Sequence, residues 1–413
     1  MATPNLALIP SAYKARQVYS VLPNNGVGDF TFVRSGNATR INKDGLIETV
    51  GNHVPRLNYD LYQGKPKQCP SLLLEPSRTN SIPYSEDFSN AAWLKSNSTI
   101  TSNSIISPDG TLNADELQVT SSGGNIYDNI GGSGDGVFSV FAKYKDVQYI
   151  RLRSTGSYAF FDIKNGVLGS TINTIDTKIE KYPNGWYKCS VIGNNTNSLV
   201  QIFVSSDGAN VGLGNVYLWG ADFQNGSYPT SYIPTSGSTE IRNAEECNGA
   251  GNSGTFNDSE GVLFAEINAL ADDGTNRFIS LTDGSNDNRV LFGYRAVSNQ
   301  VFARIEGNNS ASVDLTNVVN DTKIVIKLAI YYDSYFNYKM YLNGFLVDNA
   351  IGTDSIIGLD RFDFTNATGT ENFYGKTKQI QYFGTALTDS QLEYLTSYRS
   401  FGDMVESQNY IIQ

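Results

Sequence analysis

Residues 339–347 read KMYLNGFLV, and this stretch predicts a β-hairpin. Asn343 and Gly344 readily adopt the positive φ angles that a type I′ turn requires, and the flanking residues favour strands. Short apolar runs of the same kind recur along most of the chain, for example at residues 200–204 (VQIFV) and 323–330 (KIVIKLAI). Alternation with a period of two places one face of each strand in a core. The sequence therefore predicts an all-β fold.

One short helix is marked near the end of the sequence. Thr388 and Gln391 form a capping-box pattern, and Leu392, Leu395 and Tyr398 follow at helical spacing. We expect this helix to cover the edge of a sandwich. Because the other apolar runs alternate as strands do, helix should make up less than about one-fifth of the chain.

The 413 residues exceed what one core usually organises, since cores stop growing near about 250–300 residues. Residues 1–80 are irregular, contain short extended pieces and have too little periodic apolar sequence for their own core. Alternating strands separated by turn signals fill residues 81–240, and strands resume after a polar connection near residues 240–258. We therefore expect an N-terminal attachment and oligomerisation segment followed by two β-sandwiches, 81–240 and 241–413.

The apolar groups of the N-terminal segment require a partner. Leu72, Leu73 and Leu74 lie in a segment without sustained periodicity, so a neighbouring domain or subunit must cover them. A second copy of the chain is the simplest partner, because identical chains close a ring with one repeated contact. We expect a homo-oligomer with this segment at the contact.

The charge of the chain disfavours two classes of partner. Its formal net charge is −11, which opposes binding to nucleic acid or to an anionic membrane surface. No window approaches the length of an apolar membrane span, and the first ten residues lack a basic stretch ahead of an apolar run, so we expect neither membrane insertion nor a secretory leader. Cys69, Cys189 and Cys247 are too few and too scattered to indicate a disulfide framework or a zinc site.

Catalytic signatures are missing from the sequence. His53 is the single histidine and lies in a loop-like stretch with no adjoining nucleophile motif, so neither a serine nor a cysteine triad is indicated. Residues 249–254 match the spacing G-x-G-x-x-G, but a dinucleotide site needs a strand before it and a helix after it. Residues 375–377 (GKT) precede a strand rather than a helix. We expect no enzyme activity and no cofactor.

Acidic residues do not single out a site either. The 41 Asp and Glu residues allow many pairs, so a glycosidase pair is not indicated. The turns at residues 272–274 and 283–287 carry oxygen ligands that Ca²⁺ accepts, but they fit no EF-hand register, and we expect solvated turns rather than a metal site.

Aromatic side chains on strands are the remaining candidates for a binding site, because their faces can stack on sugar rings. Alternation puts about half of such residues in the core, and tryptophan is usually buried, so core packing is favoured over glycan stacking for each. The candidates are Trp93, Tyr127, Trp186, Trp219 and Tyr294.

Three groups of motifs resemble a widespread family of phage virion proteins, often found as head or tail appendage components. They occur in order along residues 1–240, which makes the resemblance fairly specific. They are residues 29–34 (DFTFVR), 38–42 (ATRIN) and 45–48 (GLIE), then 71–80 (SLLLEPSRTN) with 84–88 (YSEDF), and finally 229–235 (PTSYIPT).

The resemblance implies a carbohydrate-binding-like jelly roll after the second motif and a concanavalin A- or laminin G-like sandwich after the third. The pattern of residues 341–344 and 383–392 fits such a C-terminal sandwich. The resemblance also implies location in the virion as a head fibre, tail fibre or spike, a trimeric assembly, contacts with other virion proteins and a structural or adhesive role. Two alternatives stay open: a lectin-like receptor-binding protein for host surface glycans, and a polysaccharide depolymerase.

Overall fold

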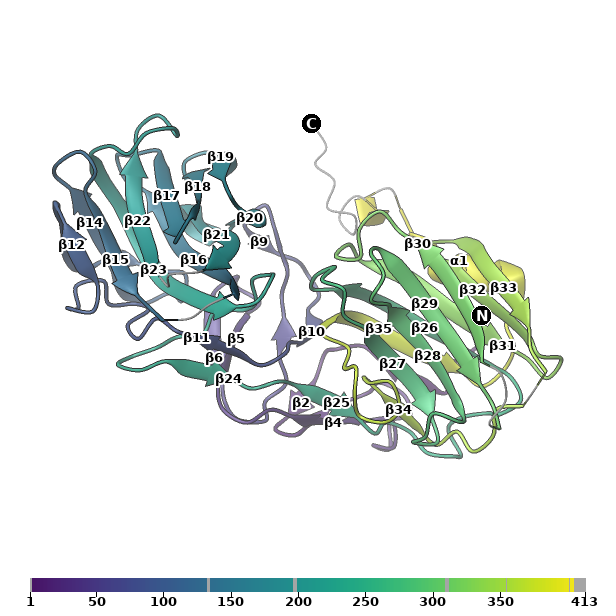
Figure 1. Ribbon diagram of the computed structural model, residues 1–413. Coiled ribbons are helices and arrows are strands. Elements are labelled where there is room, and N and C mark those ends of the chain that lie inside the picture. The colour runs from purple at the N-terminus through teal and green to yellow at the C-terminus, as the bar shows by residue number, and fades with distance from the viewer. Residues whose placement is uncertain are drawn as a thin grey trace.

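The structure is a computed structural model that describes residues 2–131, 134–195, 199–308, 312–353, 355–400 and 402–404. Strand accounts for 50% and helix for 4%, which confirms the all-β class and the expected low helix content. Figure 1 shows two lobes, each a pair of packed sheets, with the purple strands of the N-terminal segment beneath and between them.

The first sandwich consists of two six-stranded antiparallel sheets around a core that includes Phe138, Ile150 and Ile202. One sheet has the strands β12 (Leu94–Ser96), β15 (Asn125–Asn129), β22 (Leu199–Ser205), β17 (Tyr149–Ser154), β18 (Ser157–Asp162) and β19 (Val167–Ile172), in that spatial order. The other has β13 (Ser98–Ile106), β14 (Leu112–Val119), β23 (Gly214–Asn225), β16 (Gly134–Tyr144), β21 (Trp186–Asn195) and β20 (Asp176–Lys181), and the 3-10 turn η1 (Pro183–Gly185) precedes β21.

The second sandwich pairs an eight-stranded sheet with a five-stranded sheet. The larger sheet runs β33 (Phe345–Ile351), β32 (Asn337–Leu342), β31 (Ile326–Tyr332), β26 (Gly261–Ala269), β35 (Gly375–Phe383), β10 (Ser71–Leu74) and β7 (Leu57–Asn58), and β1 (Leu6–Leu8) also pairs with β35. The smaller sheet runs β30 (Val313–Val318), β29 (Gln300–Glu306), β28 (Arg289–Tyr294), β27 (Arg277–Thr282) and β34 (Arg361–Asp363).

The N-terminal segment is therefore part of the second sandwich. Three of its strands, β1, β7 and β10, belong to the eight-stranded sheet, and Leu72 pairs with Thr377 of β35. Leu72 and Leu74 lie in the core of that sandwich, and Leu73 is 3% exposed. Leu72, Leu73 and Leu74, which we expected a second copy of the chain to cover, are buried within one chain, so this argument for self-association is wrong.

The rest of the N-terminal segment folds together with the connection between the sandwiches. Strand β25 (Glu246–Asn248) of the connection completes a four-stranded sheet with β4 (Phe30–Val33), β3 (Gln17–Val18) and β2 (Tyr13–Lys14). Strand β24 (Glu240–Arg242) pairs with β11 (Arg78–Asn80), and two further hairpins are β5 (Ala38–Ile41) with β6 (Ile47–Val50), and β8 (Leu61–Tyr62) with β9 (Lys65–Pro66). The connection is thus an ordered junction.

The two strongest local predictions are confirmed. Asn343 and Gly344 have φ angles of 50° and 94° and link β32 to β33 as a hairpin. Helix α1 (Asp389–Thr396) begins after Thr388, whose side chain and that of Gln391 form the expected capping box. The helix covers the outer face of β31 and β32 through Leu392, rather than an edge of the sandwich as predicted.

Candidate functional site

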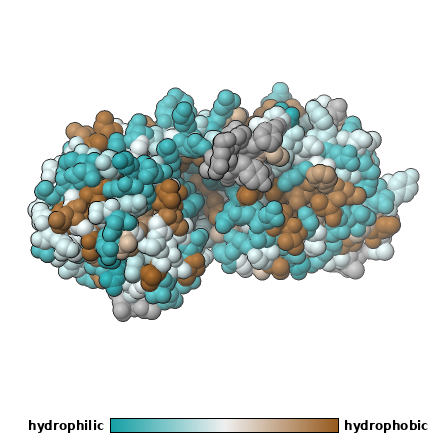
Figure 2. Space-filling model, turned by 90° about the horizontal axis from the view of Figure 1, so that it is seen from above, coloured by the Kyte–Doolittle hydropathy of each residue, from teal (hydrophilic) through white to brown (hydrophobic). Residues whose placement is uncertain are grey.

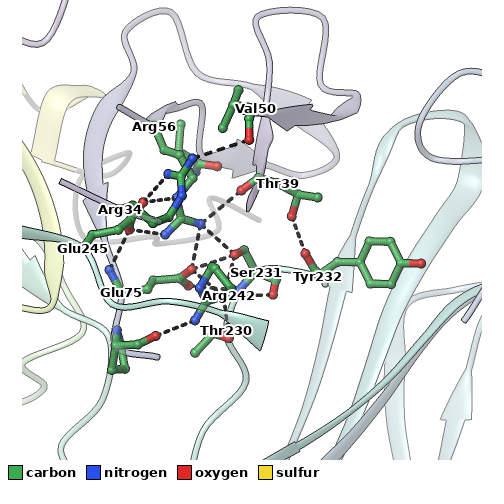
Figure 3. Close-up of polar contacts among 12 residues, drawn as sticks. Arg34, Thr39, Val50, Arg56, Glu75, Thr230, Ser231, Tyr232, Arg242 and Glu245 are labelled. Atoms are coloured by element: carbon green, nitrogen blue, oxygen red, sulfur yellow. Dashed lines mark hydrogen bonds and ion pairs between the residues drawn. The ribbon is translucent and has the colours of Figure 1, made fainter. Parts of the chain in front are cut away.

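Charged side chains gather at the junction of the N-terminal segment and the connection (Figure 3). Arg34, Arg56, Glu75, Arg242 and Glu245, here called the junction cluster, have side chains that are at most 4% exposed. The Nη1 of Arg34 lies 2.8 Å from Oε1 of Glu245, and the Nη1 atoms of Arg56 and Arg242 lie 2.8 and 3.0 Å from Oε2 of Glu75. Arg56 also pairs with Glu245 through its Nη2.

Opposite charges pair with one another within the junction cluster, where two glutamates bind three arginines. Burial alone would raise the pKa of Glu75, but Arg242 and Arg56 outweigh it and hold that pKa well below its usual range. Glu75 also accepts hydrogen bonds from the backbone N–H and the hydroxyl of Ser231, at 2.9 and 2.6 Å. Sequence motifs 71–80 and 229–235 therefore meet here. Because the cluster is enclosed, it stabilises the framework and offers no access to a ligand.

A different surface of the first sandwich is accessible. In the sheet that contains β17 and β22, alternate residues such as Ile150 and Ile202 enter the core, so their neighbours point outward. We call this outward side the open face. It carries eight residues on the four strands β15, β22, β17 and β18. Five of them are partly exposed, namely Tyr127, Arg151, Arg153, Tyr158 and Gln201, and three are buried beneath their neighbours, namely Asn125, Phe160 and Phe203.

Strand register arranges the open face in two rows that run across the strands. The first row is Asn125, Phe203, Arg151 and Phe160, because each is directly paired with the next on the neighbouring strand. By the same pairing, the second row is Tyr127, Gln201, Arg153 and Tyr158. The face thus brings four aromatic rings, two guanidinium groups and two amides together on rigid backbone.

Arg151 is the centre of the first row. Its Cζ lies 3.9 Å from the ring centroid of Phe203, 5.0 Å from that of Tyr158 and 5.8 Å from that of Phe160. Its Nε is buried without a hydrogen-bond partner among the described residues. Burial lowers the pKa of Arg151, and the charge of Arg153 lowers it further. The guanidinium is thus partly dehydrated and lies among aromatic rings, nearest to that of Phe203.

Hydrogen bonds join the two central residues of the second row, Arg153 and Gln201, to each other and to their surroundings. Arg153 donates from Nη1 to Oε1 of Gln201 at 3.0 Å and from Nε to the carbonyl of Thr155 at 2.6 Å. Gln201 donates from Nε2 to Oδ1 of Asn125 at 3.3 Å. Tyr127 of β15 is half-buried and lies beside Gln201 of β22. These contacts fix the polar side chains, which lowers the entropy lost when a ligand binds.

Of the five aromatic candidates, the structure brings one to the open face. Tyr127 lies there, whereas Trp93, Trp186, Trp219 and Tyr294 are each at most 2% exposed. The indole N–H groups of Trp93 and Trp186 donate to the carbonyls of Tyr84 and Ile106. Buried side chains cannot meet a sugar from solvent, so these four are core residues.

The other motifs from the sequence lie in structural settings. His53 has a positive φ of 57°, and its Nδ1 accepts from the backbone N–H of Arg34. Gly249 and Ala250 pair with Phe362 in a loop, and residues 375–377 lie in β35. Asp273 forms an ion pair with Arg277 at 2.7 Å.

Metal-binding clusters and membrane-spanning helices are both missing from the described part of the chain. Within the ranges that the structure describes, no group of three or more His, Cys, Asp or Glu side chains is placed to hold a metal ion. Among the same residues, no helix has the length and apolar character needed to cross a membrane.

Sequence reasoning identified the strands of the open face but missed most of its residues. The alternation of residue types along a strand was an available signal: Tyr149, Arg151 and Arg153 alternate with the apolar residues Ile150 and Leu152, and so lie on the opposite face of the strand. Arginine and tyrosine on the outward side of one strand, next to strands whose outward side carries aromatic residues, mark a candidate surface.

Comparisons with known proteins assign neither family nor ligand. No family model and no curated protein match the chain. A carbohydrate-binding module (CBM40) of the Ruminococcus gnavus IT-sialidase, bound to α2,3 sialyllactose, aligns at 16% identity over 34% of this chain and 84% of that chain, with a TM-score of 0.30. A pentraxin from Limulus polyphemus aligns at 13% identity over 34% of this chain and 71% of that chain, with a TM-score of 0.30.

A third solved structure covers more of the chain. The binding domain of the botulinum neurotoxin serotype G aligns at 13% identity over 61% of this chain and 50% of that chain, with a TM-score of 0.31. At these TM-scores the alignments leave the function to be argued from the residues of this chain.

Proposed function

We propose that this chain is a non-enzymatic, glycan-binding appendage protein of a bacteriophage particle, and that it binds carbohydrate on the open face of its first sandwich. The observation that carries the proposal is the composition of that face. Half-buried Tyr127 and Tyr158 supply aromatic faces for sugar rings, and Arg153 and Gln201 supply fixed donors and acceptors for hydroxyl groups.

The phage part of the proposal is supported by the motifs of residues 29–48, 71–80 and 229–235. Asn80 donates to the carbonyls of Ala221 and Ile233, and Glu75 binds Ser231, so these motifs form one structural framework around the junction. In an appendage, this framework holds the binding sandwich at a fixed place relative to the rest of the chain. Location in the virion and contacts with other virion proteins are part of the proposal.

Self-association, with a trimer expected from the resemblance, is also part of the proposal, but it requires a different contact. Figure 2 shows apolar residues gathered on the lobe of the second sandwich. At one edge of its larger sheet, β33 carries Phe345 and Ile351, which are 71% and 77% exposed. An edge strand with exposed apolar side chains is suited to a contact between copies.

The test of glycan binding uses the full chain on an array of bacterial surface polysaccharides and oligosaccharides. We expect saturable binding, reduced at least about tenfold in Tyr127→Ala, because an aromatic surface for stacking is lost. The matched control is Tyr335→Ala, which removes a tyrosine that is 79% exposed on the second sandwich and should leave binding unchanged. No binding by the full chain, or equal binding by both variants, would overturn the proposal.

The other parts of the proposal have separate tests. Release of reducing ends from a bound polysaccharide would contradict the non-enzymatic assignment and favour the depolymerase. Antibody labelling of intact particles should place the chain on an appendage, and labelling only of unassembled protein would contradict a virion role. Sedimentation at micromolar concentration should show an oligomer, and a 45.2 kDa monomer would contradict self-association.

A further inference from the structure

The open face differs in charge from the chain as a whole. The formal net charge is −11, yet the face presents two arginines, and no Asp or Glu forms an ion pair with either Arg151 or Arg153 among the described residues. Some other arginines of the chain do have such partners: Arg289 lies 2.5 Å from Glu306, and Arg304 lies 2.7 Å from Asp314. Arg78, which lies over the ring of Tyr228, has no such partner among the described residues either. The charge of Arg151 therefore faces aromatic rings and solvent, with no carboxylate of the described residues beside it.

The aromatic neighbours set the orientation of that charge. Phe203 lies 3.9 Å from the guanidinium of Arg151, and Tyr158 and Phe160 flank it. A guanidinium that stacks on a ring keeps its N–H groups in the plane parallel to that ring, where a planar carboxylate can accept two parallel hydrogen bonds. The Nε of Arg151 is buried, so the fork must come from the two terminal nitrogens, Nη1 and Nη2, for which no hydrogen bond to a described residue is seen.

The surroundings suit a saccharide that carries the carboxylate. Adjacent strands lie about 4.8 Å apart, so the face extends about 14 Å from β15 to β18, which accommodates an oligosaccharide. Tyr127 lies at one end, and Gln201 and Arg153 lie in the row beside Arg151. A sugar ring on Tyr127 and its polar neighbours can therefore belong to the same ligand as a carboxylate on Arg151.

We propose that the open face binds acidic glycans, and that Arg151 recognises the carboxylate of a uronic or nonulosonic acid residue by a bidentate contact. This inference rests on the glycan-binding function proposed above and names the class of glycan. Removing water from a guanidinium that has no carboxylate partner is unfavourable, and a carboxylate on the ligand restores the lost interactions, whereas a neutral sugar restores fewer of them.

The test compares trisaccharides of galacturonic, glucuronic and sialic acid with their methyl esters, which have the same rings but no charge. Titration calorimetry with the full chain should show at least about tenfold tighter binding of one acid than of its ester. Arg151→Gln should bind the acid and the ester equally. Arg151→Lys keeps the charge without the fork and should recover only part of the discrimination. The matched control is Arg304→Gln on the second sandwich, which should discriminate as the native chain does.

The outcomes separate this inference from the proposed function. Equal binding of acid and ester by the native chain, with loss of both in Tyr127→Ala, would overturn the carboxylate assignment and leave glycan binding in place. Binding of a sulfated trisaccharide as tightly as the acid would overturn the bidentate carboxylate contact in favour of general anion attraction. Binding of none of the acids or esters by a chain that binds other glycans on the array would also overturn it. The far-ultraviolet circular dichroism spectrum and the thermal denaturation midpoint of the Arg151→Gln variant show whether it is folded.

Discussion

The junction cluster and the open face use arginine in opposite ways. At the junction, Arg34 and Arg56 are fully buried and both pair with Glu245. On the open face, Arg151 is stacked on Phe203 and has no carboxylate partner among the described residues. A buried charge that the chain compensates stabilises the fold, whereas a half-buried charge that it leaves uncompensated is available for binding. The two regions should therefore respond differently to loss of charge.

The largest effect is expected when the compensation at the junction is removed. Glu245→Gln leaves Arg34 and Arg56 buried with one carboxylate fewer, and breaking a buried pair in this way costs about 3–5 kcal/mol. Urea denaturation should show this loss in the free energy of unfolding. The control Glu48→Gln breaks the ion pair with Arg40 and should cost less than about 1 kcal/mol, because the side chains of Arg40 and Glu48 are 15% and 35% exposed. Equal losses in the two variants would contradict a special role of the junction.

The junction also marks the limit of prediction from the sequence. The hairpin at Asn343 and Gly344 and the helix capped by Thr388 depend on residues close together in the chain, and both were predicted. The pairing of Leu72 with Thr377 joins segments near opposite ends of the chain. No nearby residue indicates that a strand more than 300 residues later will pair with this segment, so we expected the N-terminal segment to bind a second copy of the chain.

The open face was predictable only in part for a related reason. Alternation along β17 indicates that Arg151 points away from Ile150 and Leu152. It does not indicate which residues of β18 and β22 lie beside Arg151, and only these strands show that the neighbours are Phe160 and Phe203 rather than acidic residues. Arg151 is a candidate ligand-binding residue because no acidic side chain lies beside it, and this depends on which strands are neighbours in the folded sheet.

A second prediction concerns Asp222, which lies near the junction cluster and is only partly compensated. Burial raises the pKa of this carboxyl to about 6, although Lys188, Gln224 and Arg242 favour its charged form. In the unfolded chain Asp222 loses its proton near the ordinary aspartate pKa of 3.8. Between these values the folded state retains more protons than the unfolded state, so the contribution of Asp222 to stability falls by about 3 kcal/mol as the pH rises from about 4 to about 7.

Asp222→Asn has no such proton to lose. We expect urea denaturation to show that the variant gains stability relative to the native chain between about pH 4 and pH 7. Asp207→Asn is a control of opposite sign, because hydrogen bonds from Asn210 and Ala209 lower the pKa of Asp207. That variant should be less stable than the native chain at neutral pH and should approach it in acid. A constant difference between Asp222→Asn and the native chain across this range would contradict the raised pKa.

The smallest effect on stability is expected on the open face. Arg151→Gln removes stacking on Phe203 and Tyr158, which at a partly exposed site is worth about 0.5–1 kcal/mol, and also removes a dehydrated charge that no carboxylate balances. The two effects oppose each other, so the free energy of unfolding without ligand should change by less than about 1 kcal/mol. A carboxylated trisaccharide at about 100 times its Kd should stabilise the native chain by about 2.7 kcal/mol, and it should stabilise the variant much less. Urea denaturation with and without the trisaccharide measures both quantities. A loss of about 3 kcal/mol or more without ligand, on the order of that for Glu245→Gln, would mean that Arg151 stabilises the fold as the junction arginines do.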